Sequence, residues 1–467
     1  MLLPRLPKFL RPRPKVSIGS YGPFGWWPHR IPIHHLSTHM YIVGRSGSGK
    51  SKFIEGFLWQ LITKGQGCAF IDPHADSANH LLKLLAFQPF QKGKSWLDTE
   101  GNVNKLIFCE PGRKDYITPW NLFKSQGNPY TIATNIWEAF RRTWSSSLSA
   151  APQSKNIAIH SLLLLIENRM SLVDLPRIFF DEHLRNRLVA QSRNPEVIKF
   201  FQNRFANWGK QGLQRAEPLL NKVTALTLND NLRWMLGSSD NKLNLRRIMD
   251  KGQVLIVNLG WCDHETRALM GSLLTVSLEQ AAMSRVKIPE QFRRPFFCVI
   301  DEFQGFVDTD GSSHILSETR KAKVRFAFAH QGQYQLPTNR FQSIQEQTPF
   351  KMLFGCGIKT AEAVAKEVFT PKTGGKQSGN ASAQREAFVQ RVKNLRPREI
   401  VAWRLGEKLR YLKTLKVANP QVSGKQLDTI KVKLLLRSGT PTIKDEKPNR
   451  STDIPPPYMS SDTSFLG

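Results

Sequence analysis

The sequence predicts an α/β protein: a mostly parallel sheet flanked by helices, with an all-α domain inserted into it. Short apolar runs alternate with helical patterns near both ends of the chain, for example at residues 40–43 and 67–71. Such runs are typical of parallel strands that are covered by helices on both faces. Residues 129–247 instead show helical periodicity without strand-like runs, which predicts that they form the insertion.

A glycine-rich loop with the pattern G-x-x-x-x-G-K-S follows the apolar run at residues 40–43, and a helical pattern follows the loop. In this context the pattern is typical of nucleotide phosphate binding; a Gly/Ser turn that matches by chance is the alternative. Backbone N–H groups would face the phosphates, Lys50 would reach the β- and γ-phosphates, and Ser51 would bind Mg²⁺. The predicted nucleotide-binding residues are Gly44, Arg45, Ser46, Gly47, Ser48, Gly49, Lys50 and Ser51.

The composition is strongly basic. The chain has 467 residues, with 67 Lys and Arg against 37 Asp and Glu, and therefore a formal net charge of +30. This surplus favours a polyanionic partner, either nucleic acid or an anionic membrane face, although a merely basic protein has the same charge balance. Five widely spaced cysteines without a C-x-x-C pair predict buried free thiols rather than disulfides or a metal site. The sequence contains no apolar run long enough to cross a membrane.

Further elements are predicted in order along the chain. Apolar runs predict strands at residues 67–71, 105–109, 253–259, 295–300, 324–329 and 351–354, and a closing hairpin at 400–405 and 409–415. Helical patterns lie at 52–62, 266–285 and 361–369 beside the sheet, and at 132–144, 156–168, 180–191, 195–207 and 216–228 in the insertion. Beyond Pro420 the periodicity is lost, and the Pro/Ser/Thr/Asp-rich end predicts disorder.

These patterns divide the chain into five parts. Residues 1–35 are predicted to be a basic, proline-rich leader, without the continuous apolar region of a signal peptide. Residues 36–124 and 246–418 would form the two parts of the α/β core, and residues 125–245 the all-α insertion. Residues 419–467 would form a disordered tail.

An acidic pair, Asp301 and Glu302, follows the fully apolar strand predicted at residues 295–300. A strand of this kind is central in a sheet, so its carboxyl end would open beside the phosphate loop. Asp301 would then hold Mg²⁺, and Glu302 would orient and deprotonate the attacking water. An ordinary acidic strand end is the alternative.

Two further residues are candidates for hydrolysis. Gln331 ends the next predicted strand, where its amide would contact both the γ-phosphate and the water. Arg320 lies 11 residues earlier (331 − 320 = 11), near the end of a predicted helix. An arginine there would stabilise phosphoryl charge across a subunit interface, or it would be a solvated helix end.

Two other patterns keep open interpretations. Asp72, His74 and Asp76 are residue types that bind metals, but their spacing matches no metal site. We expect them instead to support the nucleotide site or to contact a neighbouring subunit. Residues 385–416 contain ten Lys and Arg with Trp403 and Tyr411 among them. They would line a DNA channel, or they would form one charged face of the closing hairpin.

Together these residues resemble the FtsK/HerA superfamily of hexameric DNA-pumping ATPases, and within it the coupling-protein ATPases of conjugation and type IV secretion. The resemblance covers residues 37–418. It rests on the phosphate loop and the run leading into it, on Ile71–Asp76, on Trp120-Asn121-Leu122 and the helical insertion, on Val254–Leu259, and on Arg320-Lys321 before the strand that ends at Gln331.

The resemblance implies a RecA-like core that binds ATP and Mg²⁺ at the interfaces of a homo-hexamer. It also implies that Gln331 reads the nucleotide state, that Arg320 is a finger to the neighbouring subunit, and that the insertion faces DNA and substrate. Membrane-bound coupling proteins begin with transmembrane helices, and this sequence has none before residue 37. That departure puts membrane anchoring in doubt.

The function expected from the resemblance is an ATP-driven translocase that moves single- or double-stranded DNA, alone or as a relaxase-type nucleoprotein, for a conjugation or secretion machine. It would be cytoplasmic or peripheral at the inner membrane. Two alternatives share its motifs: a HerA-like translocase that works with a nuclease in DNA end processing or defence, and a nucleotide-gated DNA-binding scaffold that does not pump.

Overall fold

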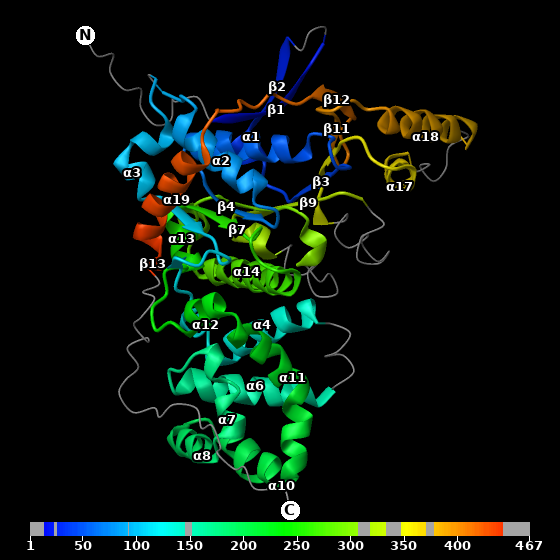
Figure 1. Cartoon of the computed structure of the whole chain (residues 1–467). Helices are drawn as coiled ribbons and strands as arrows, with labels where there is room; N and C mark the ends of the chain where they lie inside the picture. The colour runs from blue at the N-terminus through cyan, green and yellow to red at the C-terminus, as the bar shows by residue number, and fades with distance from the viewer. Residues whose placement is uncertain are drawn as a thin grey trace, which may run out of the picture.

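The computed structural model describes residues 14–22, 26–91, 93–144, 152–306, 318–332, 347–369 and 378–441. In Figure 1 a sheet with helices on both faces forms one end of the molecule, and a block of helices coloured cyan to green forms the other. Strands of the sheet come from chain segments before and after that block. The predicted fold class, an α/β core with an inserted all-α domain, is confirmed.

The described residues form a sheet in the order β2-β1-β12-β11-β10-β3-β9-β8-β4-β7-β5. The strands from β10 to β5 run parallel to one another. Because their carboxyl ends meet at one edge, the residues that follow them share that edge. These strands are β10 Phe350–Leu353, β3 Met40–Val43, β9 Val324–His330, β8 Phe296–Ile300, β4 Gly67–Asp72, β7 Val254–Asn258 and β5 Leu106–Cys109.

Four antiparallel strands extend the sheet beyond β10. Two of them, β11 Glu399–Arg404 and β12 Arg410–Lys413, are the predicted closing hairpin. The other two, β1 Lys15–Tyr21 and β2 Trp27–Pro32, form a second hairpin inside the segment expected to be a leader. Glycines and prolines interrupt the apolar alternation of this segment, which hid its strands from pattern analysis.

Alternate residues of each strand enter two separate apolar layers, as the two-residue period of a strand requires. In β8, Phe296, Cys298 and Ile300 join the layer that includes α14, whereas Phe297 and Val299 join the layer that includes α1 and α2. The helices beside the sheet are α1 Lys50–Thr63, α2 Asp76–Phe87, α3 Glu100–Val103, α13 Leu245–Lys251, α14 His264–Ser284, α17 Ile358–Val368, α18 Ser378–Lys393 and α19 Gly424–Ser438.

The described residues of the insertion form helices joined by loops. Its first helix, α4, packs on α14 of the core, where buried Arg142 and Glu279 form an ion pair at 3.1 Å. The helices are α4 Pro129–Thr143, α6 Pro152–Glu167, α7 Arg177–Phe180, α8 Glu182–Gln191, α9 Pro195–Lys199, the π-helix Phe200–Phe205, α10 Ala206–Trp208, α11 Lys210–Leu228 and α12 Asp230–Gly237.

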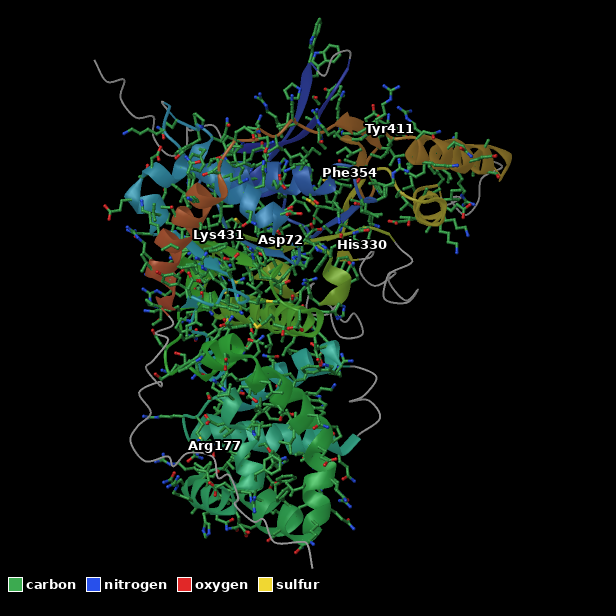
Figure 2. The ribbon with its side chains drawn as sticks, viewed as in Figure 1. Asp72, Arg177, His330, Phe354, Tyr411 and Lys431 are labelled. Carbon is green, nitrogen blue, oxygen red and sulfur yellow. The ribbon has the colours of Figure 1, made fainter. Side chains whose placement is uncertain are left out.

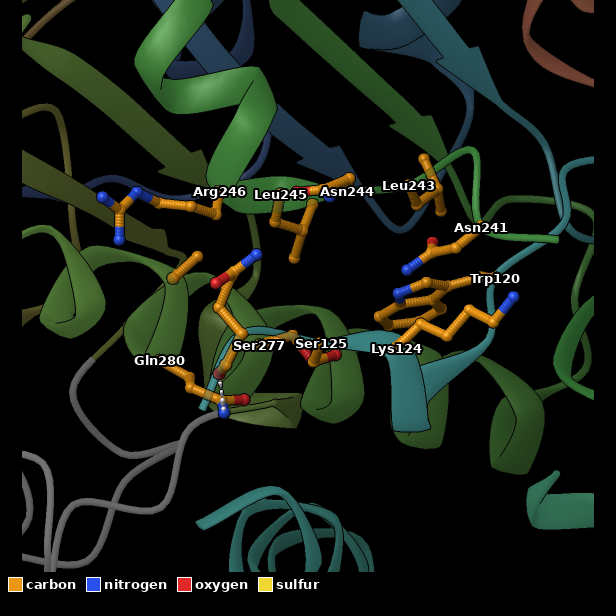
Figure 3. Close-up of a pocket in the computed structure, with 12 residues that line it drawn as sticks. Trp120, Lys124, Ser125, Asn241, Leu243, Asn244, Leu245, Arg246, Ser277 and Gln280 are labelled. Carbon is orange, nitrogen blue, oxygen red and sulfur yellow. Dashed lines mark hydrogen bonds between the residues drawn. The ribbon is translucent and has the colours of Figure 1, made fainter. Parts of the chain in front are cut away.

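The two chain segments that connect the insertion to the core lie side by side and are joined by hydrogen bonds. Asn121 Nδ2 donates to Ser238 O at 3.0 Å, and Asn241 Nδ2 donates to Asn121 O at 3.3 Å. Figure 3 shows Trp120 and Asn241 here, lining a pocket of about 20 Å³ that α14 closes with Gln280. The pocket holds no more than about one water, so this junction is a structural contact rather than a ligand site.

The end of the chain differs from the prediction of a disordered tail at 419–467. Residues 424–438 form α19, which begins with a capping box at Ser423 and Gln426 and packs beside β5. Leu434 and Leu435 bury its apolar side. Its weak periodicity concealed a helix that tertiary packing stabilises. Residues 1–13 and 442–467, expected to form the leader arm and the disordered end, lie outside the described residues.

Candidate nucleotide-binding and hydrolysis site

The phosphate loop follows β3 at the carboxyl edge of the sheet. Gly44 N–H donates to His330 O at 3.2 Å and Arg45 N–H donates to Gly355 O at 2.9 Å, which ties the loop to the last residue of β9 and to the segment after β10. Gly47 and Gly49 have positive φ angles of 75° and 96°. Glycine adopts this conformation without the strain that a Cβ would cause. The predicted strand, loop and helix are therefore all present.

Lys50 begins α1, and its buried side chain turns toward the residues after β8. Its Nζ lies 3.1 Å from Asp301 Oδ1 and 2.8 Å from Glu302 Oε1. β8 is separated from β3 by β9 alone, so sheet order brings together three charges that are some 250 residues apart in the sequence. An ammonium group between two carboxylates offsets much of the cost of burying them.

The two carboxylates have opposite pKa shifts. Burial raises the pKa of Asp301 above its usual range, although Lys50 opposes this effect. Burial also acts to raise the pKa of Glu302, but the charge of Lys50 and hydrogen bonds from Gln304, Lys50 and Gln331 outweigh it and lower the pKa. Neighbouring carboxyl groups with divergent pKa values suit different roles. The lowered pKa favours the ionised form of the Glu302 carboxylate.

Glu302 also has an unusual backbone. Its φ and ψ are both 47°, the left-handed region that residues other than glycine rarely adopt. This conformation ends β8 sharply, and Glu302 N–H donates to Asp301 Oδ1 at 3.1 Å. Gln304 Nε2 donates to Glu302 Oε2 at 2.7 Å. The strained turn and this amide hold the Glu302 carboxylate beside Lys50.

The end of β9 contributes His330 and Gln331. The Gln331 side chain lies close enough to Glu302 to help lower the pKa of that carboxyl group, so the structure brings Gln331 to the acidic pair. The ring of His330 is fully buried, and its Nε2 forms a short hydrogen bond with the Tyr41 hydroxyl of β3. Figure 2 places His330 and Asp72 at the level of the sheet, far from Arg177 in the helical block.

The residues of the loop fit a nucleoside triphosphate with Mg²⁺. Ser48 Oγ is buried and has no hydrogen-bond partner among the described residues. A Cβ at Gly44 would lie 2.7 Å from Ser48 Oγ, so only glycine leaves room there for the loop to close. Mg²⁺ would take oxygen ligands from Ser51, on the first turn of α1, and from Asp301. A bound Mg²⁺ would neutralise part of the phosphate charge.

Arg320 lies apart from these residues. It is exposed on the short helix before β9, at the amino edge of the sheet. β9 spans seven residues, Val324–His330, and therefore separates Arg320 from Gln331 by about 20 Å. Within one subunit the structure does not bring Arg320 to the phosphate loop.

The Asp72-His74-Asp76 motif forms the turn between β4 and α2. Asp72 is buried and accepts hydrogen bonds from His74 N–H at 2.9 Å and Ala78 N–H at 2.7 Å. It satisfies N–H groups at the start of α2, the usual work of a carboxylate at a helix N-terminus. In the part of the chain that the structure describes, no group of three His, Cys, Asp or Glu side chains is arranged to hold a metal ion.

The basic stretch at residues 385–416 is divided between structural and exposed groups. The Arg398 guanidinium donates to Thr414 O at 2.8 Å. The backbone N–H of Arg398 donates to Ser48 O of the phosphate loop at 2.9 Å. The Arg391 guanidinium lies over the Tyr411 ring at 3.4 Å. Lys393, Lys408 and Arg410 remain exposed. Both interpretations of this stretch, a DNA-facing surface and a charged hairpin face, retain residues that fit them.

Sequence analysis missed His330, Tyr41 and Gln304. His330 and Tyr41 belong to apolar strands, where a polar side chain gave no separate signal. Gln304 follows the acidic pair by two residues, but its contact with Glu302 depends on the left-handed turn, which no pattern predicted. The expectation that the five cysteines are free and buried agrees with the structure.

A parallel sheet with a phosphate loop after β3 and an acidic pair after β8 is the RecA-like P-loop NTPase fold. No family model matches the sequence, and no curated protein matches it either. Among the described residues, no helix is long and apolar enough to cross a membrane.

Solved structures place the fold more narrowly. The unbound bacterial conjugative coupling protein TrwBdeltaN70 has a TM-score of 0.54 and 16% identity, over 84% of this chain and 89% of that chain. TrwB bound to a non-hydrolysable ATP analogue has a TM-score of 0.53 and 17% identity, over 84% and 89%. VirB4 of Thermoanaerobacter pseudethanolicus has a TM-score of 0.55 and 12% identity, over 86% and 96%. The predicted resemblance to coupling-protein ATPases is confirmed at the level of the fold.

Proposed function

We propose that this chain is an ATPase that translocates DNA in the manner of a conjugative coupling protein. The observation that carries the proposal is the contact of Lys50 with Asp301 and Glu302 beside the phosphate loop. The fold shared with TrwB and VirB4 supports the same function. One of the TrwB structures contains ADP and Mg²⁺. The net charge of +30 supports DNA as the polyanionic partner.

In the proposed reaction, Glu302 accepts a proton from a water molecule. The water oxygen then forms a bond to the γ-phosphorus, and the bond from that phosphorus to the β–γ bridging oxygen breaks, which releases ADP and phosphate. Lys50 stabilises charge on the β- and γ-phosphates, and Gln331 orients the water. The lowered pKa of Glu302 keeps the carboxylate ionised at neutral pH.

We further propose a cytoplasmic ring, most simply a hexamer, in which Arg320 of one subunit completes the site of the next. The exposed position of Arg320, away from its own phosphate loop, supports a role in trans. The helical block would face DNA or a nucleoprotein substrate. The basic residues that remain exposed between 385 and 416 would contact the DNA backbone, so the affinity should fall as salt rises.

The first test is ATP turnover by the full chain, with and without DNA, at low and high salt. Lys50→Ala should abolish ATP binding. Glu302→Gln should retain ATP binding but lower turnover by about 100-fold or more, because it removes the general base. Lys433→Ala, an exposed lysine on α19, is the matched control and should behave as the wild type.

DNA-stimulated turnover that decreases with salt and disappears in both site variants would support the translocase. Turnover that does not respond to DNA, or full turnover in Glu302→Gln, would contradict it and favour a nucleotide-gated scaffold. Recovery of a nuclease with the active protein would instead favour an end-processing translocase.

A further inference from the structure

The β1–β2 hairpin carries exposed aromatic side chains at its outer end. Tyr21 is 46% exposed, Trp27 51% and Trp26 69%; together we call these three residues the aromatic tip. Tyr21 and Trp27 are register partners whose ring centroids lie 6.0 Å apart. A Cβ at Gly22 would lie 1.9 Å from the Trp27 ring, so the ring packs closely over the glycine and is held outside the apolar core.

Clustering distinguishes the aromatic tip from other exposed apolar side chains. In the described ranges, Tyr130, Phe180 and Trp261 are also exposed, but they lie singly on separate elements. Single exposed apolar residues are ordinary on protein surfaces, whereas adjacent ones mark an interaction site. The hairpin also projects from the body at the end opposite the helical block (Figure 1).

The surroundings of the aromatic tip are basic. The first acidic residue of the whole chain is Glu55. Lys413 is the register partner of Ser20, and Arg410 is close enough to lower the pKa of His29, after the larger effect of burial. Arg30 lies close enough to Lys64 to lower the pKa of that lysine, again after burial. Glu407 is the acidic group that faces His29.

The outer strand is poorly suited to pairing with a strand of another protein. β2 is the edge of the sheet, but Pro28 and Pro32 remove two of its N–H donors. Proline on an edge strand blocks strand addition. A partner must therefore recognise the side chains of the tip, which combine an apolar ring with a polar atom in Trp and Tyr.

We propose that the aromatic tip docks on an anionic lipid surface. Trp and Tyr rings favour the boundary between lipid head groups and acyl chains, and nearby cations are attracted to anionic head groups. Lys413, opposite Ser20, and Arg410 and Arg30, which lie further from the tip, supply those cations. With the hairpin on the lipid, the helical block points away from the membrane and stays free to contact its substrate.

The test uses the full-length protein and vesicles of phosphatidylcholine, alone or with phosphatidylglycerol. The wild type should sediment with the anionic vesicles and shift its tryptophan emission to shorter wavelength, and high salt should weaken the binding. Trp26→Ser combined with Trp27→Ser should lower vesicle binding about tenfold or more. Trp261→Ser, an exposed tryptophan on the loop after β7, is the matched control and should bind as the wild type.

ATP turnover by the same variants separates this proposal from the proposed function. The hairpin variant should keep wild-type turnover, which also shows that it folds. Vesicle binding that is equal in the hairpin variant and the wild type would overturn the proposal. A wild-type protein that does not bind anionic vesicles would also overturn the proposal. If that protein self-associates through the two tryptophans, the tip is a protein interface instead. If the wild-type protein binds the vesicles but shows no ATP turnover, the proposed ATPase function is contradicted and the lipid-docking proposal is not.

Discussion

Lys50, Asp301 and Glu302 show how single residues acquire different roles from their surroundings. Asp301 and Glu302 are adjacent in the sequence, yet burial raises the pKa of Asp301 while Lys50 and two glutamine amides lower that of Glu302. The left-handed backbone at Glu302 turns the second carboxylate away from the direction of the strand. One acidic pair thereby supplies a buried candidate metal ligand and an ionised candidate base.

His330 makes stability depend on pH. Burial, followed by the charge of Lys50, lowers its pKa from 6.5 to about 4 in the folded protein. Between these values the unfolded chain binds more protons than the folded chain, so acidification favours unfolding. The free energy of unfolding should therefore fall by on the order of 3 kcal/mol as pH decreases from 6.5 to 4.

Urea unfolding across this pH range measures the effect. His330→Gln should lose this part of the pH dependence, because its side chain does not titrate. His183→Gln on α8 is the control; its exposed side chain loses little hydration on folding, so its slope should match the wild type. An unchanged slope in His330→Gln would show that His330 does not titrate as described.

At the scale of elements, α19 is attached to the sheet through a buried polar contact. Lys431 Nζ lies 2.7 Å from Glu110 Oε1, which also accepts from Asn258 Nδ2 at 2.6 Å. Lys431 and Glu110 are both buried. Removal of Lys431 would leave the buried Glu110 carboxylate with the Asn258 amide and with Arg113 at 3.8 Å, but without its nearest cation. Removal of one charge of a buried pair is more destabilising than removal of both.

Lys431→Met should therefore lower the free energy of unfolding by about 3–5 kcal/mol. The double variant Lys431→Met with Glu110→Gln should recover much of this loss, because the remaining groups are neutral. Lys433→Met, on the exposed side of α19, should change stability by less than about 0.5 kcal/mol. Denaturant unfolding checks all three, and equal losses in the single and double variants would contradict this account.

The connection between the core and the insertion is also an element-scale feature. Two segments run between them, and the bonds of Asn121 to Ser238 and Asn241 join the segments to each other. The Arg142–Glu279 pair adds a direct contact between α4 and α14. The helical block is therefore held to the core through both connecting segments and through the contact of α4 with α14.

At the scale of the whole molecule, the placement of Arg320 predicts a shared active site. Arg320→Ala should retain ATP binding but lose turnover, and Lys50→Ala should lose ATP binding. In the proposed ring, a mixture of the two variants should recover part of the turnover, because some interfaces would combine an intact phosphate loop with an intact arginine.

Lys321→Ala is the matched control for this experiment, because Lys321 is the neighbouring residue and its exposed side chain pairs with Glu318 at the surface. Its turnover should stay near the wild-type value. Recovery is measured as ATP turnover across mixing ratios. Full turnover in Arg320→Ala, or no recovery in any mixture, would rule out a finger role for this arginine.

The sequence by itself determined the alternation of strands and helices, the all-α insertion and the phosphate loop. These features depend on local periodicity and on residues that are consecutive in the chain, such as the glycines before Lys50. It also marked Asp301, Glu302 and Gln331 as candidates, because each follows an apolar run. The sequence did not predict β1 and β2 in the leader or α19 in the tail. These elements are stabilised by packing against the sheet rather than by a strong pattern of their own.

Only the tertiary structure decided which of these residues meet. Sheet order places β8 and β9 beside β3, which brings Lys50 to the acidic pair and Gln331 to Glu302. It leaves Arg320 at the opposite edge of the sheet, and it uses Asp72 to satisfy backbone N–H groups. Contacts between distant segments depend on strand order, which local sequence does not encode, because each strand has the same apolar pattern whichever neighbour it pairs with.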